Sequence, residues 1–185
     1  MRRIALAVVA MALLAACAQT EGNDTRAPAT PQPNQADATF AQSMIPHHEQ
    51  AIEMAEAIKA RTTRPELVEL AGDITTTQGA EIARMRGWLR AWGKPEAMAG
   101  MDHDQMGMPG MVDQGEMDEL MGLRGARFDL AFVDMMTRHH QGAIQMANTE
   151  LKDGSLPEVK HLAQQIISAQ QREVSQLAAW KQSWA

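Results

Sequence analysis

The chain has 185 residues, with 17 basic and 23 acidic side chains and a net charge of −6. This acidic balance argues against binding to nucleic acid or to an anionic membrane surface, and it mildly favours cations. Cys17 is the only cysteine, so no disulfide can form within one chain. Once the N-terminal segments described next are set aside, about 145 residues remain, enough for one domain with its own core.

The N-terminus has the pattern of a secretory signal peptide. Arg2 and Arg3 precede an apolar run from Ile4 to Ala16, which is too short for a bilayer span of about 20 residues. We therefore expect residues 1–16 to be a signal peptide. Its end, LLAAC, resembles the lipobox of bacterial lipoproteins, in which the cysteine, here Cys17, becomes the new N-terminus and carries the lipid. The alternative is an ordinary cleavage site beside a chance cysteine.

The next segment, residues 17–39, is rich in Pro, Thr, Asn, Gln and Asp and has no apolar period. This composition predicts a disordered tether. Cleavage would leave 15 basic and 23 acidic side chains, a net charge of −8. We expect the protein to be secreted across the bacterial inner membrane and to contact a membrane only through its lipid, either at the cell membrane or at the outer membrane facing the periplasm.

An internal repeat dominates the remaining sequence. The segment from Phe40 to Trp92 recurs without a gap 92 positions later, from Phe132 to Trp184, and 17 of the 53 aligned positions are identical. Such self-similarity indicates a duplicated structural unit. Each copy sets one methionine three residues before a His-His pair and another six residues beyond it. The domain, 40–185, then divides into repeat 1 (40–92), a Met-rich connection (93–126) and repeat 2 (127–185).

Each repeat is interpreted as a helical hairpin. Apolar residues recur at three- and four-residue steps along 40–58 and again along 67–89, the period of an amphipathic helix. No alternating β-rich segment competes with this interpretation. Because two hairpins must bury their apolar stripes against each other, the expected fold is all-α, a four-helix bundle made of two duplicated hairpins.

Local signals predict where the helices begin and end. Thr63 and Ser155 each fit an S/T-x-x-E capping box before the second helix of a hairpin. Gly154 is a plausible C-terminal stop. A short extra helix is expected before the second hairpin, from near Asp113 to about Leu123, with Asp113 and Glu116 as its cap.

The hairpin geometry predicts a polar layer inside the bundle. With the turn between Thr62 and Thr63, residues whose numbers sum to about 125 lie at the same height. The expected neighbours are His47 with Gln78 and Met44 with Glu81 in repeat 1, and His139 with Gln170 and Met136 with Glu173 in repeat 2. A buried carboxylate is costly unless it is paired or binds a cation.

Adjacent histidines on a helix are about 100° apart, so we expect only one of each pair to point inward. Two interpretations of the layer stay open. One is a metal site, favoured by the doubled histidines beside methionines. The other is a core network in which histidine hydrogen-bonds to glutamate.

The connection carries a second cluster of soft ligands. Within the stretch AMAGMDHDQMGMPGM this cluster contains Met98, Met101, His103, Met106, Met108 and Met111. Glycines and a proline argue against a helix here, so burial is not expected to explain these methionines. Thioether and imidazole together suit copper, above all Cu(I). The alternative is an adaptable apolar surface for a partner.

The signatures MIPHHEQAIEMA and MMTRHHQGAIQMA, with GAEIARMRGWL and QREVSQLAAW, resemble the domain of unknown function numbered 305, a family of secreted bacterial proteins. The resemblance covers Phe40 to Trp184. It implies a ferritin-like bundle and extracytoplasmic copper binding or tolerance. By position it implies these ligands: Met44, His47, His48, Met54, Met136, His139, His140 and Met146. Di-iron chemistry is not expected, because neither Glu81 nor Glu173 is followed by a histidine three residues later.

The leading functional hypothesis is a lipid-anchored, non-enzymatic protein that sequesters copper, delivers it or confers tolerance to it. Cu(I) is the preferred ion and Cu(II) the second, with Glu81 and Glu173 as further candidate ligands and a metal-donor or metal-acceptor protein as a partner. One alternative is a structural or interaction module whose polar layer fixes the bundle register. Another is a redox-active metal oxidase that uses the glutamates and histidines.

Overall fold

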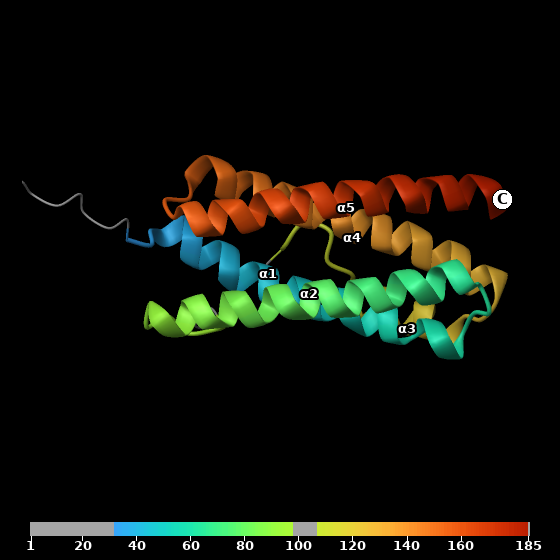
Figure 1. Cartoon of the computed structure of the whole chain (residues 1–185). Coiled ribbons are helices and arrows are strands. Elements are labelled where there is room, and N and C mark those ends of the chain that lie inside the picture. The colour runs from blue at the N-terminus through green and yellow to red at the C-terminus, as the bar shows by residue number, and fades with distance from the viewer. Residues whose placement is uncertain (1–31, 98–106, 185) are drawn as a thin grey trace, which may run out of the picture. The chain divides into compact units, whose positions relative to one another are not determined.

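The computed structural model describes residues 32–97 and 107–184. Within these residues the chain is helical and has no strand (Figure 1), which confirms the all-α prediction. The helices are α1 (Gln35–Glu56), the short 3-10 helix η1 (Ile58–Ala60), α2 (Pro65–Ala91), α3 (Gln114–Gly122), α4 (Ala126–Asp153) and α5 (Pro157–Trp184). No helix in this described part is long and apolar enough to cross a membrane. The expected signal peptide and Cys17 lie outside the described residues.

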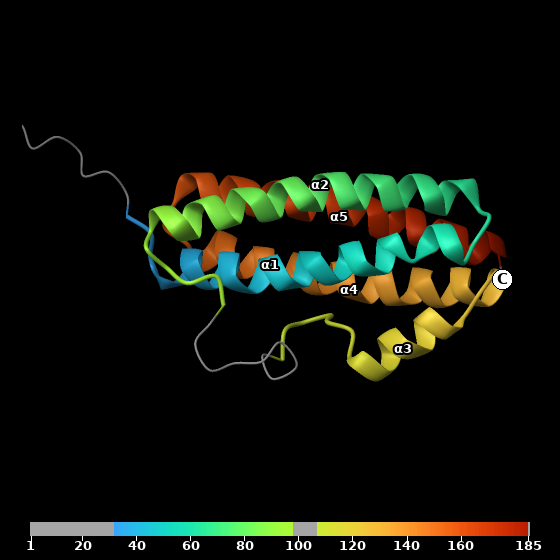
Figure 2. The ribbon, with the colours of Figure 1, turned by 90° about the horizontal axis from the view of Figure 1, so that it is seen from below.

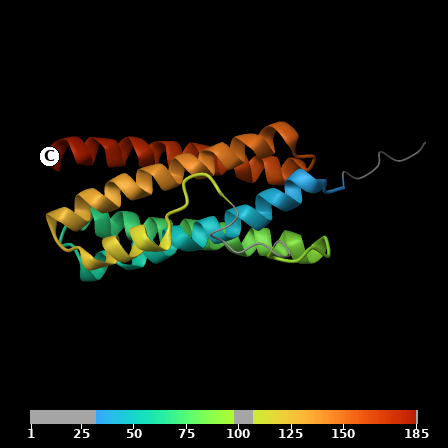
Figure 3. The same ribbon diagram turned by 180° about the vertical axis from the view of Figure 1, so that it is seen from behind.

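The four long helices form two layers. α1 packs along α2, α4 packs along α5, and α1 also lies against α4. Figure 2 shows α2 and α5 in one layer and α1 and α4 in the other. α3 and the segment before it lie on the outer side of the α1/α4 layer, which Figure 3 shows from behind. The two helices that carry the His-His pairs are therefore neighbours.

The first helix begins earlier than the sequence predicted. α1 starts at Gln35, so the predicted tether, 17–39, was too long at its C-terminal end. Asn34 caps the helix: its side chain accepts from the Asp37 N–H, and the Asp37 carboxylate accepts from the Asn34 N–H. This reciprocal pair is a capping box with Asp in place of the usual Glu, and the polar composition around it hid the helix start.

The predicted capping boxes of the second hairpin helices were wrong. Helix α2 has Arg64 as its N-cap, in an extended conformation and without a side-chain cap. Pro65 explains the shift, because the residue before a proline is disfavoured in the α region and proline itself prefers the first helical position. α5 likewise begins at Pro157, so Ser155 lies too far upstream for the predicted box. Its hydroxyl instead hydrogen-bonds to Asp37 of α1 at 2.6 Å.

Two other local predictions are confirmed. α3 begins after Asp113, whose side chain forms a capping box with Glu116. α4 ends at Asp153 with Gly154 as its C-cap. Both signals depend on residues within four positions of one another, which is why the sequence alone could reveal them.

The apolar core is divided into two clusters by the His-His pairs. Along α1, Met44 belongs to one cluster and Ala51 to the other. Along α4 the order is reversed, with Met136 in the cluster of Ala51 and Ala143 in the cluster of Met44. Membership changes across the His-His pair in both helices, so a polar layer crosses the middle of the bundle.

A second buried polar contact closes the end of the bundle near the α4–α5 turn. Burial alone would raise the pKa of Asp37, but hydrogen bonds from the Ser155 hydroxyl and from three backbone N–H groups hold that pKa below its ordinary value. Glu150 is also buried, at 1% exposure. Burial, followed by the Asp37 carboxylate, raises the pKa of Glu150 to about 8. Glu150 is therefore neutral at moderately acidic pH, when Asp37 is charged.

This pair predicts a pH dependence of stability. The folded state keeps a proton on Glu150 that the unfolded chain releases near pH 4.5, so its contribution is complete below pH 4.5 and is lost as the pH rises towards 8. In Glu150→Gln that loss should disappear, which thermal unfolding followed by circular dichroism over this pH range would detect. Glu53→Gln, at an exposed position of α1, is the control and should follow the wild type. Parallel curves for wild type and Glu150→Gln would contradict the assignment.

Candidate metal centre

The structure brings all four repeat histidines together in the interior. His47, His48, His139 and His140 are each at most 1% exposed. The rings of His47 and His139 lie in contact, with centroids 3.7 Å apart and planes tilted by 36°. The polar layers of the two repeats, which the sequence could not place relative to each other, therefore meet where α1 crosses α4.

The prediction that one histidine of each pair faces inward was wrong. α1 packs against both α2 and α4, so two positions about 100° apart on its surface can both be buried. His47 contacts His139 of α4, whereas His48 contacts Glu81 of α2. The interior is wide enough for both rings because each histidine helix has two helical neighbours.

Each outer histidine has a carboxylate partner. His48 Nε2 lies 2.8 Å from Glu81 Oε2, and His140 Nε2 lies 2.5 Å from Glu173 Oε2. The predicted neighbour of Glu81 was Met44, four residues earlier. The difference follows from side-chain direction, because helical side chains lean towards the N-terminus of their own helix. In an antiparallel pair, two side chains that lean in this way meet when both residues lie slightly further along the chain than residues whose Cα atoms are at the same height.

The glutamines predicted for the layer are buried as well. Gln78 and Gln170 are each 3% exposed, and in the described part of the chain their side-chain oxygens have no hydrogen-bond partner. The level pairing of His47 with Gln78 and of His139 with Gln170 stays a prediction. Two orphaned amide oxygens add to the unsatisfied polar groups in the interior.

The ring nitrogens show what the site could bind. In all four histidines Nδ1 is buried and has no hydrogen-bond partner among the described residues, and the same holds for Nε2 of His139. A carboxylate or a backbone carbonyl can only accept, so the Nε2 atoms of His47, His48 and His140 are the donors. A neutral imidazole that donates from Nε2 keeps its lone pair on Nδ1. The centre therefore holds unused nitrogen lone pairs.

Burial keeps the two central rings uncharged. Burial, with the neighbouring His48 as the next cause, lowers the pKa of His47 to about 3. Burial also holds the pKa of His139 well below its ordinary value, with His47 as the next cause. Only the neutral ring can coordinate a metal ion, so both rings are in the form that a metal requires.

A segment of the connection closes the site from outside. We call residues 107–112 the strap. The backbone oxygen of Pro109 lies 3.1 Å from His47 Nε2. Gln50 anchors the strap by accepting from the Val112 N–H and donating to the Val112 carbonyl. Figure 3 shows the strap running over α1 and α4.

The strap approaches α4 backbone to backbone. A Cβ atom on Gly142 would lie 1.9 Å from the Pro109 carbonyl oxygen, and one on Gly110 would lie 2.6 Å from that of Arg138. Gly110 also has a φ of +78°, which favours glycine. Gly142 and Gln50 occupy equivalent positions in the two repeats. Gln50 hydrogen-bonds to the strap, and Gly142 leaves room for its backbone. Sequence reasoning missed this role, although a lone glycine within an amphipathic helix was the available signal.

The predicted methionine ligands separate into three groups. Met44, Met54 and Met136 are fully buried, and Met146 is half-buried. In the connection, Met108 is buried at 9% exposure and Met111 is half-buried. The expectation that burial would not explain the connection's methionines is therefore wrong for Met108, because the strap folds onto the bundle. The predicted ligands outside the described residues are Met98, Met101, His103 and Met106.

The buried histidine rings are not arranged in a preformed coordination geometry. Across 32–97 and 107–184, no group of three or more His, Cys, Asp or Glu side chains is arranged to hold a metal ion. The contact between His47 and His139 leaves no space between those rings. The orphaned Nδ1 atoms suit a soft ion of low coordination number once the rings turn, with thioethers completing its shell.

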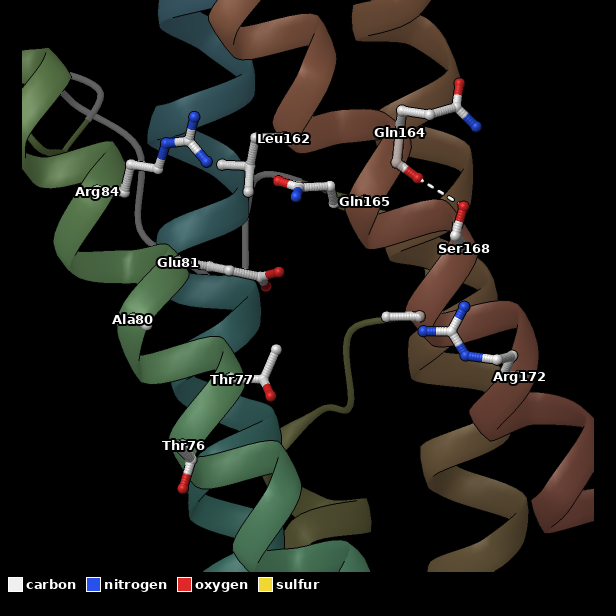
Figure 4. A pocket seen from close by; sticks show the side chains of 11 residues that line it. Thr76, Thr77, Ala80, Glu81, Arg84, Leu162, Gln164, Gln165, Ser168 and Arg172 are labelled. Atoms are coloured by element: carbon white, nitrogen blue, oxygen red, sulfur yellow. Dashed lines mark hydrogen bonds between the residues drawn. The ribbon is translucent and has the colours of Figure 1, made fainter.

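Glu81 also faces a groove between α2 and α5, of about 580 Å³. Figure 4 shows its carboxylate between the two helices, with Arg84 from α2 and Arg172 from α5. Its side chain is 13% exposed. One face of the polar layer thus reaches this groove, whereas the strap covers the opposite face.

The glycine contact generates a prediction. Gly142→Ala should push the strap away from His47, destabilise the fold by about 1–3 kcal/mol, and speed hydrogen exchange at the Val112 amide. Gly72→Ala is the matched control: Gly72 is also within a helix, but nothing lies within 4 Å of its Cβ position. That change should stabilise by about 0.5–1 kcal/mol. Equal exchange at Val112 in Gly142→Ala and wild type would show that the strap does not depend on this contact.

The chain is similar to several solved structures. A DUF305 protein from Streptomyces coelicolor, provisionally described as secreted, is 34% identical with a TM-score of 0.75, covering 80% of this chain and 93% of that one. A DUF305 fragment from Deinococcus radiodurans is 29% identical with a TM-score of 0.75, covering 83% and 99%. CopM in its Cu(II)-bound form is 35% identical with a TM-score of 0.71, covering 80% and 97%. CopM is also known in Cu(I)-bound, Ag-bound and apo forms.

No curated protein matches the sequence. The model of the family described as a domain of unknown function, DUF305, matches residues 37–181. This match spans both His-His pairs, both carboxylate partners and the strap, and it leaves out only the N-terminal segment and the last residues of α5. The chain belongs to the DUF305 family.

Proposed function

We propose that this protein binds copper, preferably as Cu(I), through the buried imidazoles that meet between α1 and α4. The observation that carries the proposal is the set of four buried Nδ1 atoms without hydrogen-bond partners in the described chain. A polar atom left unsatisfied in a protein interior is costly and calls for an explanation. Coordination of a metal ion by these lone pairs supplies one.

The ligand chemistry favours a soft ion. Neutral imidazole and thioether are the donors that suit Cu(I), and the sequence places both beside each other twice. Met44 and Met136 each precede a His-His pair by three residues, so they lie on the same helical face, one turn away. We therefore assign Met44, Met136, His47 and His139 as the central ligands. The likeness to CopM, which has been solved with Cu(I), Cu(II) and silver, supports copper as the ion.

The carboxylates have a supporting role in the proposal. Metal-binding histidines commonly donate their second ring N–H to a carboxylate, which fixes the tautomer and the ring orientation. Glu81 and Glu173 occupy that position for His48 and His140. Glu81 and Glu173 then orient the outer rings and need not bind the ion themselves.

The cellular role follows from the N-terminal pattern. We propose that the protein is exported, lipid-anchored at Cys17, and extends the bundle from the membrane on the residues that follow. There it would hold copper outside the cytoplasm, for sequestration, delivery or tolerance, and exchange it with a donor or acceptor protein. The paired hairpins make a ferritin-like bundle in this proposal, with no catalytic residue assigned.

The proposal predicts that the double variant His47→Gln, His139→Gln loses high-affinity Cu(I) binding. The loss should exceed the roughly 10–100-fold effect of changing an outer-shell partner. Competition with a chromogenic Cu(I) chelator gives the affinity, and circular dichroism confirms the fold. His161→Gln is the control, because His161 is exposed on α5.

Melting temperature provides an independent measurement. Cu(I) should raise it in wild type and in His161→Gln but not in the double variant, since a ligand of the native state stabilises that state. If the double variant kept wild-type affinity, the histidine layer would be structural and the proposal would fail.

A further inference from the structure

We propose that soft cations reach the buried imidazoles through the cleft between α1 and α4, with Met146 as the first ligand and the strap as the barrier. This inference rests on the proposed function and adds the route of uptake. It assigns Met146 to a transit site instead of the central ligand set.

The cleft has a volume of about 230 Å³ and lies beside the strap. Its walls come from the N-terminal half of α1 and the C-terminal half of α4, and Pro109 of the strap lines it too. Its lining offers a cation the Met146 sulfur, the hydroxyl oxygens of Thr39, Ser43 and Thr149, and the side-chain oxygens of Gln145 and Glu150. A thioether beside hydroxyl groups offers a weak first site, from which a soft ion can leave again.

Pro109 joins the cleft to the histidine layer. It lines the cleft, and its carbonyl oxygen accepts from His47 Nε2 at 3.1 Å. On this route an ion passes from Met146 to His47 by an exchange of ligands and the loss of this hydrogen bond, after which the ring can turn. Neither a proton nor an electron needs to be transferred.

The two repeats differ at this point. Met54, the position equivalent to Met146, is fully buried in an apolar cluster, whereas Met146 is half-buried and lines the cleft. The strap bonds to His47, whereas neither ring nitrogen of its equivalent, His139, has a hydrogen-bond partner in the described chain. The two repeats therefore differ where the strap and the cleft lie, and both features are found on the same face of the bundle.

The groove between α2 and α5 is the competing route, because it leads to Glu81 and so to His48 (Figure 4). Its lining includes Arg84 and Arg172, for which no ion pair is found within the described residues. These two positive charges outnumber the one carboxylate in the lining, that of Glu81, so the groove opposes the approach of a cation. Within the described residues, the cleft is lined by no lysine or arginine.

The test compares rates with affinities in the full-length protein. Transfer of Cu(I) from a chromogenic chelator is followed by absorbance in wild type, Met146→Leu and Met54→Leu. Leucine keeps the apolar volume and removes the sulfur. We expect Met146→Leu to take up Cu(I) on the order of tenfold more slowly, a barrier increase of about 1.4 kcal/mol, with unchanged affinity. Met54→Leu should match the wild-type rate.

Two further variants make the test specific to the route. Ala36→Phe fills the cleft without removing a ligand and should also slow uptake, whereas Gly142→Ala displaces the strap and should speed it. Ala80→Phe fills the α2/α5 groove and should leave the rate unchanged.

The outcomes separate this inference from the proposed function. A wild-type rate in Met146→Leu, or slow uptake in Ala80→Phe alone, would overturn the route while copper binding at the histidines stands. Lower affinity of Met146→Leu with an unchanged rate would make Met146 a central ligand and also overturn the transit role. If His47→Gln, His139→Gln bound Cu(I) like wild type, the proposed function itself would fail.

Discussion

The structure depends on placing four imidazoles inside a helical interior that satisfies few of their nitrogens. Of the eight ring nitrogens, five have no hydrogen-bond partner in the described chain. Each such group costs about 1–3 kcal/mol, so the layer lowers the stability of the metal-free fold. The apolar clusters on either side offset that cost and keep the central rings neutral. A coordinated ion would satisfy the lone pairs of the rings that bind it, so part of this cost becomes a preference for the metal-bound state.

Duplication explains the geometry, and one local difference explains the accessibility. Packing α1 against α4 brings equivalent histidines into contact. At one equivalent pair, however, the repeats differ: Gln50 anchors the strap, and Gly142 leaves room for it. As a result, the strap covers one face of the histidine layer. On the opposite face, Glu81 lines the groove between α2 and α5.

Much of the fold could be predicted because its signals are local. Apolar periodicity gave the helices, and Asp113 with Glu116 gave the start of α3. The partner of Glu81 was predicted to be Met44 and is His48, because the prediction placed residues by Cα height and ignored the lean of helical side chains. The strap could not be placed, since its contacts with His47 and Gly142 join segments 30 or more residues apart. The burial of Met108 depends on that same docking.

The most direct test of the central claim is to observe the histidine nitrogens as the ion binds. Long-range proton–nitrogen NMR of the ¹⁵N-labelled protein distinguishes Nδ1 from Nε2 in each ring, and Ag(I) serves as a redox-inert substitute for Cu(I). The account predicts that the Nδ1 resonances of His47 and His139 shift on addition of Ag(I), while His161 stays unchanged. Shifts confined to the histidines outside the bundle interior, with His47 and His139 unaltered, would contradict it.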